Sequence, residues 1–273
     1  MEQIINLLNY TFIQRALICG IAISLCAAMI GVILVLKNYS MIGHGLGEVG
    51  FAALTLAVAL NLPPLAISIP IVMLAATIIM IISQKKGESG DITIALVSTG
   101  ALATGIIITS ISTGFNIDVA NYMFGSILSM TKNDVIISVC LSIVVLIVFM
   151  FYYNRLFMIT YDERFAKTRG INVVFYQFLI SFLTALIVVL GMRMMGTLLI
   201  SSLIIFPAVI AKGLTNSFKQ LIIISSIISI TCFTLGMFVS FFLNLPTGAS
   251  IAGVYILLLL ISKVVNVVFK WFR

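Results

Sequence analysis

Charged side chains are scarce in this sequence. Asp, Glu, Lys and Arg together make up 8% of its 273 residues, there is one histidine and one tryptophan, and apolar residues make up 62%. A chain with so little charge and a mean hydropathy of +1.28 cannot cover a water-soluble surface. The composition therefore excludes a soluble globular enzyme and indicates a polytopic membrane protein.

Motifs for several kinds of chemistry are also missing. The chain has no GxxxxGK[ST] phosphate-binding loop, so it is not its own P-loop ATPase, and it lacks the HExxH and GxSxG signatures of hydrolases. Its four cysteines stand in apolar runs without CxxC spacing, which favours buried apolar residues over disulfides or a metal cluster. We expect a protein that is not an enzyme, holds no permanent cofactor, and takes its energy from a partner or an ion gradient.

Long apolar runs make up most of the chain. A transmembrane helix needs about 20 apolar residues, and nine stretches approach that length. They cover about 13–36, 41–60, 65–83, 92–113, 135–153, 175–195, 197–213, 219–242 and 249–268. GMRMMG alone separates the sixth from the seventh, so one of that pair can be short or broken. The predicted fold is one all-α transmembrane domain, residues 1–273, with eight or nine spans; the first run is too long for a signal peptide.

The basic residues predict the orientation of this helical bundle. Lys and Arg concentrate on the cytoplasmic side of membrane proteins. With nine spans and the N-terminus outside, only Arg15, Lys132 and Arg193 of the 15 basic residues fall on the outer side. We therefore expect the N-terminus outside and the C-terminus in the cytoplasm. This sorting, with anionic lipid head groups, explains the net charge of +7 without a nucleic-acid partner.

The segment MIGHGLGEVG, residues 41–50, places His44 four residues before Glu48 within a predicted membrane helix. Ionisable groups are costly in hydrocarbon and are usually functional or paired. A spacing of four puts both side chains on one helix face, where an imidazole nitrogen and a carboxylate oxygen can bind one divalent cation. Glycines in the same segment allow another helix to approach closely: Gly43, Gly45, Gly47 and Gly50.

The pair has two interpretations. In one, His44 and Glu48 bind a metal ion on its way through the membrane; in the other, they only bond each other or a neighbouring helix. Two ligands do not complete a zinc shell, which usually has four. A transport site would therefore need a second copy of the chain or partial hydration. We favour transport, because two ionisable groups share one face of the predicted helix.

NRLFMITYDERFAKTRGIN, residues 154–172, is the longest polar stretch predicted on the cytoplasmic side. From Asp162 to Arg169 it predicts a short amphipathic helix, with Phe165 and Ala166 facing inward, that ends at Gly170. Such a helix could dock into a partner protein. A solvated basic loop is an equal alternative on these residues alone.

Four segments together resemble the zinc/manganese permease family, the membrane subunits of bacterial ABC importers for zinc, manganese or iron(II). They are LVLKNYSMIGHGLGEVGFAALTLA (34–57), ANYMFGSILSM (120–130), YDERFAKTRGI (161–171), and GTLLISSLIIFPAVIAK with LNLPTGASIAGVYILLLLIS. The resemblance covers essentially the whole chain, in family order and spacing. It implies a compact all-helical permease in a bacterial plasma membrane, similar in fold to vitamin B12-type importers.

The resemblance also implies partners. We expect a homodimer of permeases, each coupled to a cytoplasmic ABC ATPase and supplied from outside by a metal-binding lipoprotein, with the ion path on the dimer axis. Within a coupling segment of about 154–174, Asp162, Ala166 and Gly170 match the family's ATPase-docking pattern.

On the outer side, Asp118 and the loop NLPTGAS, with Pro246 and Gly248, are candidates for docking the lipoprotein. Ordinary cap and turn chemistry is the alternative for these residues.

The chain departs from the family at the intramembrane pair. The usual order is aspartate followed four residues later by histidine; here His44 stands at the aspartate position and Glu48 at the histidine position. One nitrogen and one oxygen donor suit Zn(II), Mn(II) or Fe(II). We expect zinc as the transported ion, with manganese or iron(II) next. The alternative is an ion-coupled secondary transporter, in which the same two groups relay protons without an ATPase.

Overall fold

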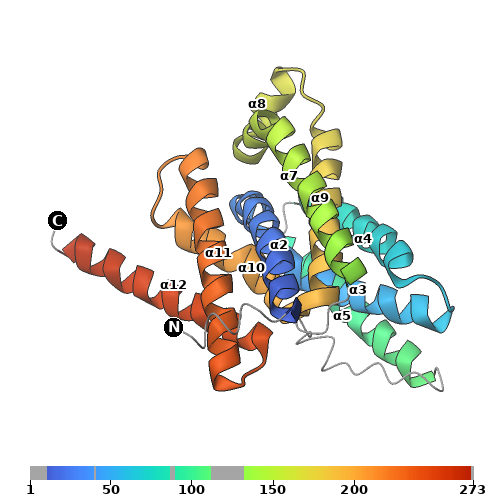
Figure 1. Ribbon diagram of the computed structural model, residues 1–273. Coiled ribbons are helices and arrows are strands. Elements are labelled where there is room, and N and C mark those ends of the chain that lie inside the picture. Colours follow the sequence, from blue (N-terminus) through green and yellow to red (C-terminus); the bar gives the residue numbers. More distant parts are fainter. Residues whose placement is uncertain (1–10, 40, 87–89, 112–131, 272–273) are drawn as a thin grey trace.

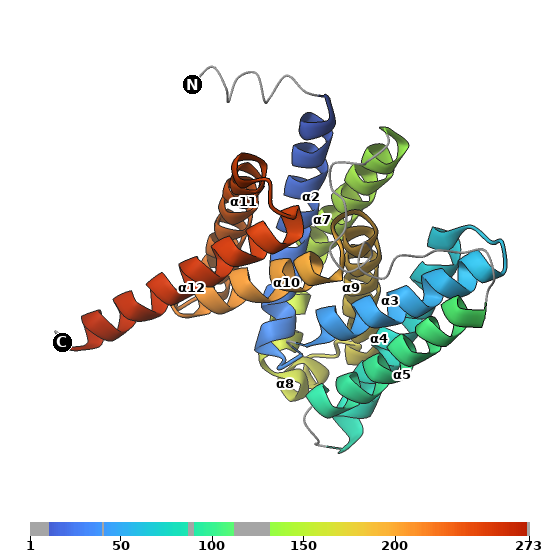
Figure 2. The same ribbon diagram turned by 90° about the horizontal axis from the view of Figure 1, so that it is seen from below.

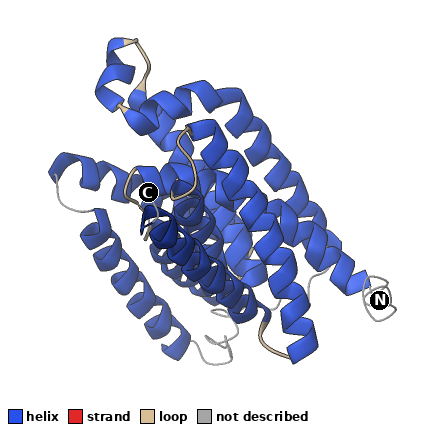
Figure 3. Cartoon of the chain, turned by 90° about the vertical axis from the view of Figure 1, so that its left-hand side faces the viewer, coloured by secondary structure: helices blue, strands red, loops and turns tan. Residues whose placement is uncertain are grey.

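The computed structural model describes residues 11–39, 41–86, 90–111 and 132–271, and all regular structure in these ranges is helical (Figures 1 and 3). The helices are α2 (Thr11–Leu36), α3 (Ile42–Ala59), α4 (Pro64–Lys86), α5 (Gly90–Ile111), α7 (Lys132–Tyr161), α8 (Glu163–Thr168), α9 (Val173–Met195), α10 (Thr197–Lys212), α11 (Phe218–Leu243) and α12 (Thr247–Trp271). All except the short α8 correspond in order to the nine predicted apolar stretches. The predicted all-α class is therefore confirmed.

Seven of these helices are long and apolar enough to cross a membrane. The apolar parts of α4 and α10, Ala66–Ile82 and Thr197–Lys212, are shorter. The 16 residues of α10 span about 24 Å at 1.5 Å per residue, less than the hydrocarbon thickness of about 30 Å. The prediction of eight or nine spans agrees with this arrangement.

A single residue separates α9 from α10. The expected GMRMMG connection is mostly helical, because α9 continues through Met195 and only Gly196 interrupts it. Gly196 has a φ of 85°, a region that glycine enters without the steric cost that a Cβ imposes. The chain therefore changes direction sharply there, and α10 crosses the end of α9 (Figure 2).

Helices α2 and α9 form the centre of the bundle. In their most apolar windows, 78% of residues in α2 and 72% in α9 are buried, against 22% in α5 and in α7. Helix α2 packs against α7, α9, α10 and α11. At its crossing with α10, a Cβ on Gly31 would lie 2.0 Å from the carbonyl oxygen of Ile204, so only glycine fits this close approach.

Three connections predicted on the cytoplasmic side meet at one end of the bundle. In the turn between α2 and α3, Lys37 forms an ion pair with Glu163 of α8. At the start of α11, the ring of Phe218 lies with its centroid 5.6 Å from that of Tyr153 and 5.1 Å from that of Phe157, both on α7. This end therefore brings together the α2–α3 turn, α8 and the α10–α11 turn.

Candidate functional site

His44 and Glu48 lie one turn apart on α3. The Nε2 atom of His44 is 3.3 Å from Oε1 of Glu48, and the two side chains are 47% and 18% exposed, respectively. The side chains therefore share one face of α3, as expected from their spacing. Neither is sealed in the protein interior, so both remain accessible to an ion or to a second chain.

The separation of these two atoms suits a shared cation. Zinc binds a histidine nitrogen at about 2.0–2.1 Å and a carboxylate oxygen at about 2.0–2.2 Å, and the tetrahedral angle then places the two donors roughly 3.3–3.4 Å apart. Within the part of the chain that the structure describes, no group of three or more His, Cys, Asp or Glu residues could hold a metal ion. An ion at this pair would need its remaining ligands from water or from another protomer.

A second face of α3 packs closely on α10. A Cβ on Gly43 would lie 3.0 Å from Cδ1 of Ile204, and one on Gly47 would lie 3.2 Å from Cγ2 of Thr197. Both contacts are tighter than ordinary van der Waals packing. The small-residue spacing of four therefore brings α3 and α10 together along one side.

A third face of α3 packs on α5. A Cβ on Gly45 would lie 2.5 Å from Cγ2 of Ile94, a methyl group on the branched Cβ that lies close to the backbone and has little room to move. Gly50 is also buried. Helix α3 is thus confined between α5 and α10, and its polar pair lies on the face that these contacts leave open.

The first turn of α8 is fixed by Asp162. Its Oδ1 atom accepts hydrogen bonds from the backbone N–H groups of Arg164 and Phe165, at 2.9 and 3.0 Å. These bonds satisfy donors that a helix start otherwise leaves unpaired. The aspartate therefore has a structural role in starting α8 here, in addition to any contact with a partner.

The last turn of α8 is fixed by Gly170. This residue has a φ of 74°, and its N–H donates to the carbonyl of Lys167, while the N–H of Ile171 donates to the carbonyl of Ala166. This pair of bonds around a left-handed residue is the Schellman motif. Both ends of a helix only six residues long are therefore held in place.

The two apolar residues of α8 lie on different faces. Ala166 is fully buried, but Phe165 is 48% exposed, so the expectation that both face inward is wrong. Consecutive helical residues are about 100° apart around the axis, and Ala166 takes the inward direction. The ring of Phe165 lies under the guanidinium group of Arg169, 5.2 Å from Cζ to the ring centroid. Phe165 is therefore available to a partner protein.

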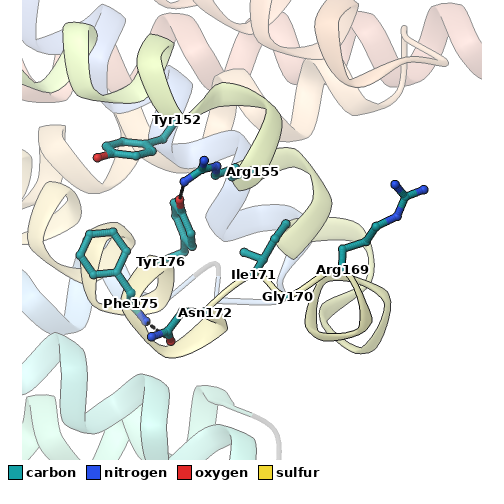
Figure 4. Close-up of a pocket in the computed structure, with 8 residues that line it drawn as sticks. All are labelled: Tyr152, Arg155, Arg169, Gly170, Ile171, Asn172, Phe175 and Tyr176. Atoms are coloured by element: carbon teal, nitrogen blue, oxygen red, sulfur yellow. Dashed lines mark hydrogen bonds between the residues drawn. The ribbon is translucent and has the colours of Figure 1, made fainter.

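A cavity of about 460 Å³ adjoins the turn from α8 to α9 (Figure 4). It is lined by Tyr152, Arg155, Arg169, Gly170, Ile171, Asn172, Phe175 and Tyr176. Arg155 donates a hydrogen bond to the hydroxyl oxygen of Tyr176, and the two side chains point toward each other. Asn172 caps α9 by accepting from the N–H of Phe175 at 3.2 Å. The sequence pattern did not indicate this cavity, although Arg155 stands two residues after an apolar run that ends in tyrosines.

The candidate docking residues on the outer side have mixed positions. Asp118 lies outside the described residues. Pro246 is exposed just before α12, whereas Gly248 is buried in the first turn of that helix. Of these candidates, Pro246 is the one that the structure places at an accessible surface.

Comparison with known proteins identifies the family. The profile of the ABC 3 transport family matches residues 9–266. The chain belongs to this family. The expected membership and the all-helical permease fold are thereby confirmed; ABC 3 family permeases are membrane subunits rather than enzymes, and the ATPase of such systems is a separate subunit.

Relatives of this ABC 3 family permease are similar over nearly their whole length. It is 30% identical over 261 residues to the manganese import system permease protein ScaB of Streptococcus gordonii, covering 96% of this chain and 94% of that one. It is 29% identical over 248 residues to the high-affinity zinc uptake system membrane protein ZnuB of Buchnera aphidicola, covering 90% and 95%. A solved structure of PsaBC from Streptococcus pneumoniae in complex with Fab has 30% identity and a TM-score of 0.84, covering 96% and 94%.

Proposed function

We propose that this ABC 3 family permease imports a divalent metal ion across the bacterial plasma membrane, driven by ATP hydrolysis in a separate cytoplasmic subunit. The observation that carries the proposal is the 3.3 Å separation of His44 Nε2 and Glu48 Oε1 on an accessible face of α3. The names of two relatives, one a manganese import permease and the other part of a zinc uptake system, support the same class of cargo.

Zinc is the proposed cargo, with manganese next. Zn(II) stands above Mn(II) in the general order of affinity for nitrogen and oxygen ligands, and imidazole suits zinc better than it suits manganese. His44 supplies such a nitrogen. A site made only of oxygen donors would favour manganese instead.

The incomplete ligand set supports a homodimer. One protomer offers one nitrogen and one oxygen donor at this pair, and a second protomer related by twofold symmetry would bring a matching pair. Four donors would then meet on the dimer axis, the number that zinc usually takes. A lipoprotein at the outer surface, near Pro246, would supply the ion.

The structure of α8 supports its docking to the ATPase. Both of its ends are fixed by local hydrogen bonds, and Phe165 presents an apolar ring to the solvent. An exposed aromatic residue on a rigid support is typical of an interface anchor. With α8 on the cytoplasmic side, the N-terminus lies outside and the C-terminus inside, in keeping with the distribution of Lys and Arg.

The test is metal uptake by the permease with its ATPase and lipoprotein in liposomes. We expect zinc uptake that requires ATP and a lower initial rate with manganese at equal concentration. His44→Ala and Glu48→Ala should each lower uptake at least about tenfold, equivalent to about 1.4 kcal/mol. Thr104→Ala is the control, because Thr104 is exposed on α5 and its hydroxyl donates to the carbonyl of Ala101 in the same helix.

Two outcomes would overturn parts of the proposal. Uptake that continues without ATP and stops when the proton gradient is dissipated would indicate an ion-coupled secondary transporter. Normal uptake by both alanine variants would show that the pair only stabilises α3 and that the ion takes another path.

A further inference from the structure

Glu163 connects α8 to the turn that precedes α3. Its carboxylate forms an ion pair with the ammonium group of Lys37, although the two residues are 126 positions apart in the sequence. The side chain of Lys37 is only 7% exposed and that of Glu163 is 33% exposed. Because the lysine side chain is nearly buried, loss of its partner would leave a buried charge unpaired, which costs more than loss of a solvent-exposed ion pair.

Backbone hydrogen bonds link the turn that carries Lys37 to both α2 and α3. After α2 ends, the N–H of Tyr39 donates to the carbonyl of Leu34, and Asn38 takes the left-handed conformation with a φ of 60°. The N–H of Ile42 then donates to the carbonyl of Tyr39, which joins the turn to the first turn of α3. A displacement of Lys37 would therefore be passed to the start of α3 through these hydrogen bonds.

A residue of α9 also contacts the carboxylate of Glu163. The amide Nε2 of Gln177 donates to the same Oε1 atom of Glu163 at 3.3 Å, and Gln177 is buried. The body of α8 packs on α7 and α9, so Glu163 adds a connection in a different direction, toward α2 and α3. Figure 2 shows α8 next to the point where α2 ends and α3 begins.

We infer that the Lys37–Glu163 ion pair transmits movement of α8 to α3, and so to His44 and Glu48. The inference rests on the proposed function, in which the ATPase moves α8. His44 follows Lys37 by seven residues, with the hydrogen-bonded turn between them. Lys37 and Glu163 are positioning residues: they touch no metal, but they set the position of the helix that would bind it.

The experiment measures coupling, defined as metal ions transported per ATP hydrolysed by the permease–ATPase complex in liposomes. Lys37→Glu and Glu163→Lys should each lower this ratio about fivefold while ATP hydrolysis stays within about twofold of the wild type. The exchange variant K37E/E163K should restore the ratio to within about twofold, because it rebuilds the pair with its charges reversed. Lys219→Glu, an exposed lysine at the same end of the bundle, makes the same charge change and should not alter the ratio.

A purely structural role would give a different result. Loss of folded complex lowers uptake and ATP hydrolysis together and leaves their ratio unchanged, so an unchanged ratio in the single variants would overturn the inference. An exchange variant no better than either single variant would also overturn it. If a charge reversal prevents assembly, Lys37→Gln and Glu163→Gln provide the same readout.

Failure of the inference can be told apart from failure of the proposed function. A wild-type complex without ATP-dependent metal uptake would refute the proposed function, and the inference with it. A wild-type complex that transports metal, together with single variants that keep its ratio, would refute the ion-pair link alone.

Discussion

Helices α3 and α8 differ in how their polar groups are held. On α8, Asp162 is bound to two backbone N–H groups and Glu163 to both Lys37 and Gln177. On α3, the ring of His44 approaches the carboxylate of the next turn at 3.3 Å and is otherwise half exposed. The two carboxylates at the start of α8 are thus each held by two donors from the protein, whereas His44 and Glu48 lie within reach of each other and of an ion.

This difference fits two different tasks. An element that transmits force must keep its shape and its contacts, so fixed ends and a partly buried ion pair are useful on α8. A site that conducts an ion must bind it weakly enough to release it, so an incomplete and partly hydrated ligand set is useful on α3. In α3 the rigidity comes instead from glycines packed on α5 and α10, which fix the helix while leaving its polar face open.

The largest effect is expected from breaking the packing that holds α3. Gly45→Val would place a Cβ 2.5 Å from Cγ2 of Ile94, and overpacking of this kind costs about 1–3 kcal/mol. The purified permease should therefore unfold at a lower temperature in detergent, and metal uptake should fall because the polar face of α3 is displaced. Thermal unfolding monitored by size-exclusion chromatography measures the change in unfolding temperature directly.

Gly100→Val is the matched control for that substitution. Gly100 lies on an exposed face of α5, and a Cβ added there would meet no other atom within 4 Å. The same change at this position should leave the unfolding temperature close to that of the wild type. Equal unfolding temperatures for the two variants would contradict the close approach of α3 and α5.

The sequence predicts the local features of both helices well. Apolar runs mark the membrane helices, and the aspartate and glycine at the ends of α8 mark its boundaries, because caps involve residues only a few positions apart. The spacing of four likewise predicts the shared face of His44 and Glu48. These features depend on neighbours along the chain, and therefore a single sequence contains them.

The features that the sequence does not predict are those between distant segments. Lys37 is one of several basic residues on the predicted inner side, and nothing near it in the sequence indicates its contact with Glu163. Phe165 is expected to face inward because hydrophobicity does not distinguish burial in the protein from exposure to a partner. For the same reason the apolar runs do not show that α2 and α9 are central, since lipid and protein interiors are equally apolar.

An intermediate effect is expected from loosening α8. Asp162→Ala removes the side chain that caps the helix, at a cost of about 1 kcal/mol, and should weaken binding of the ATPase to the permease about fivefold. Asp162→Asn should retain most of the affinity, because asparagine caps helices about as well as aspartate. Titration of the labelled ATPase against permease in detergent measures both. Equal losses for the two variants would indicate that the charge of Asp162, and not its capping, supports binding.

The smallest effect is expected from exchanging the two polar groups of α3. The double variant H44D/E48H restores the order usual in the family and keeps one nitrogen and one oxygen donor on the same helix face. It moves each donor by four residues, about 6 Å along the axis. If the ion passes both groups during transport, zinc uptake should stay within about threefold of the wild type, since each donor type is still met once along the path. His44→Asp alone leaves only oxygen donors and should shift preference from zinc toward manganese. A double variant as inactive as Glu48→Ala would mean that each donor is needed at its own depth, and that the open face of α3 is as position-dependent as α8.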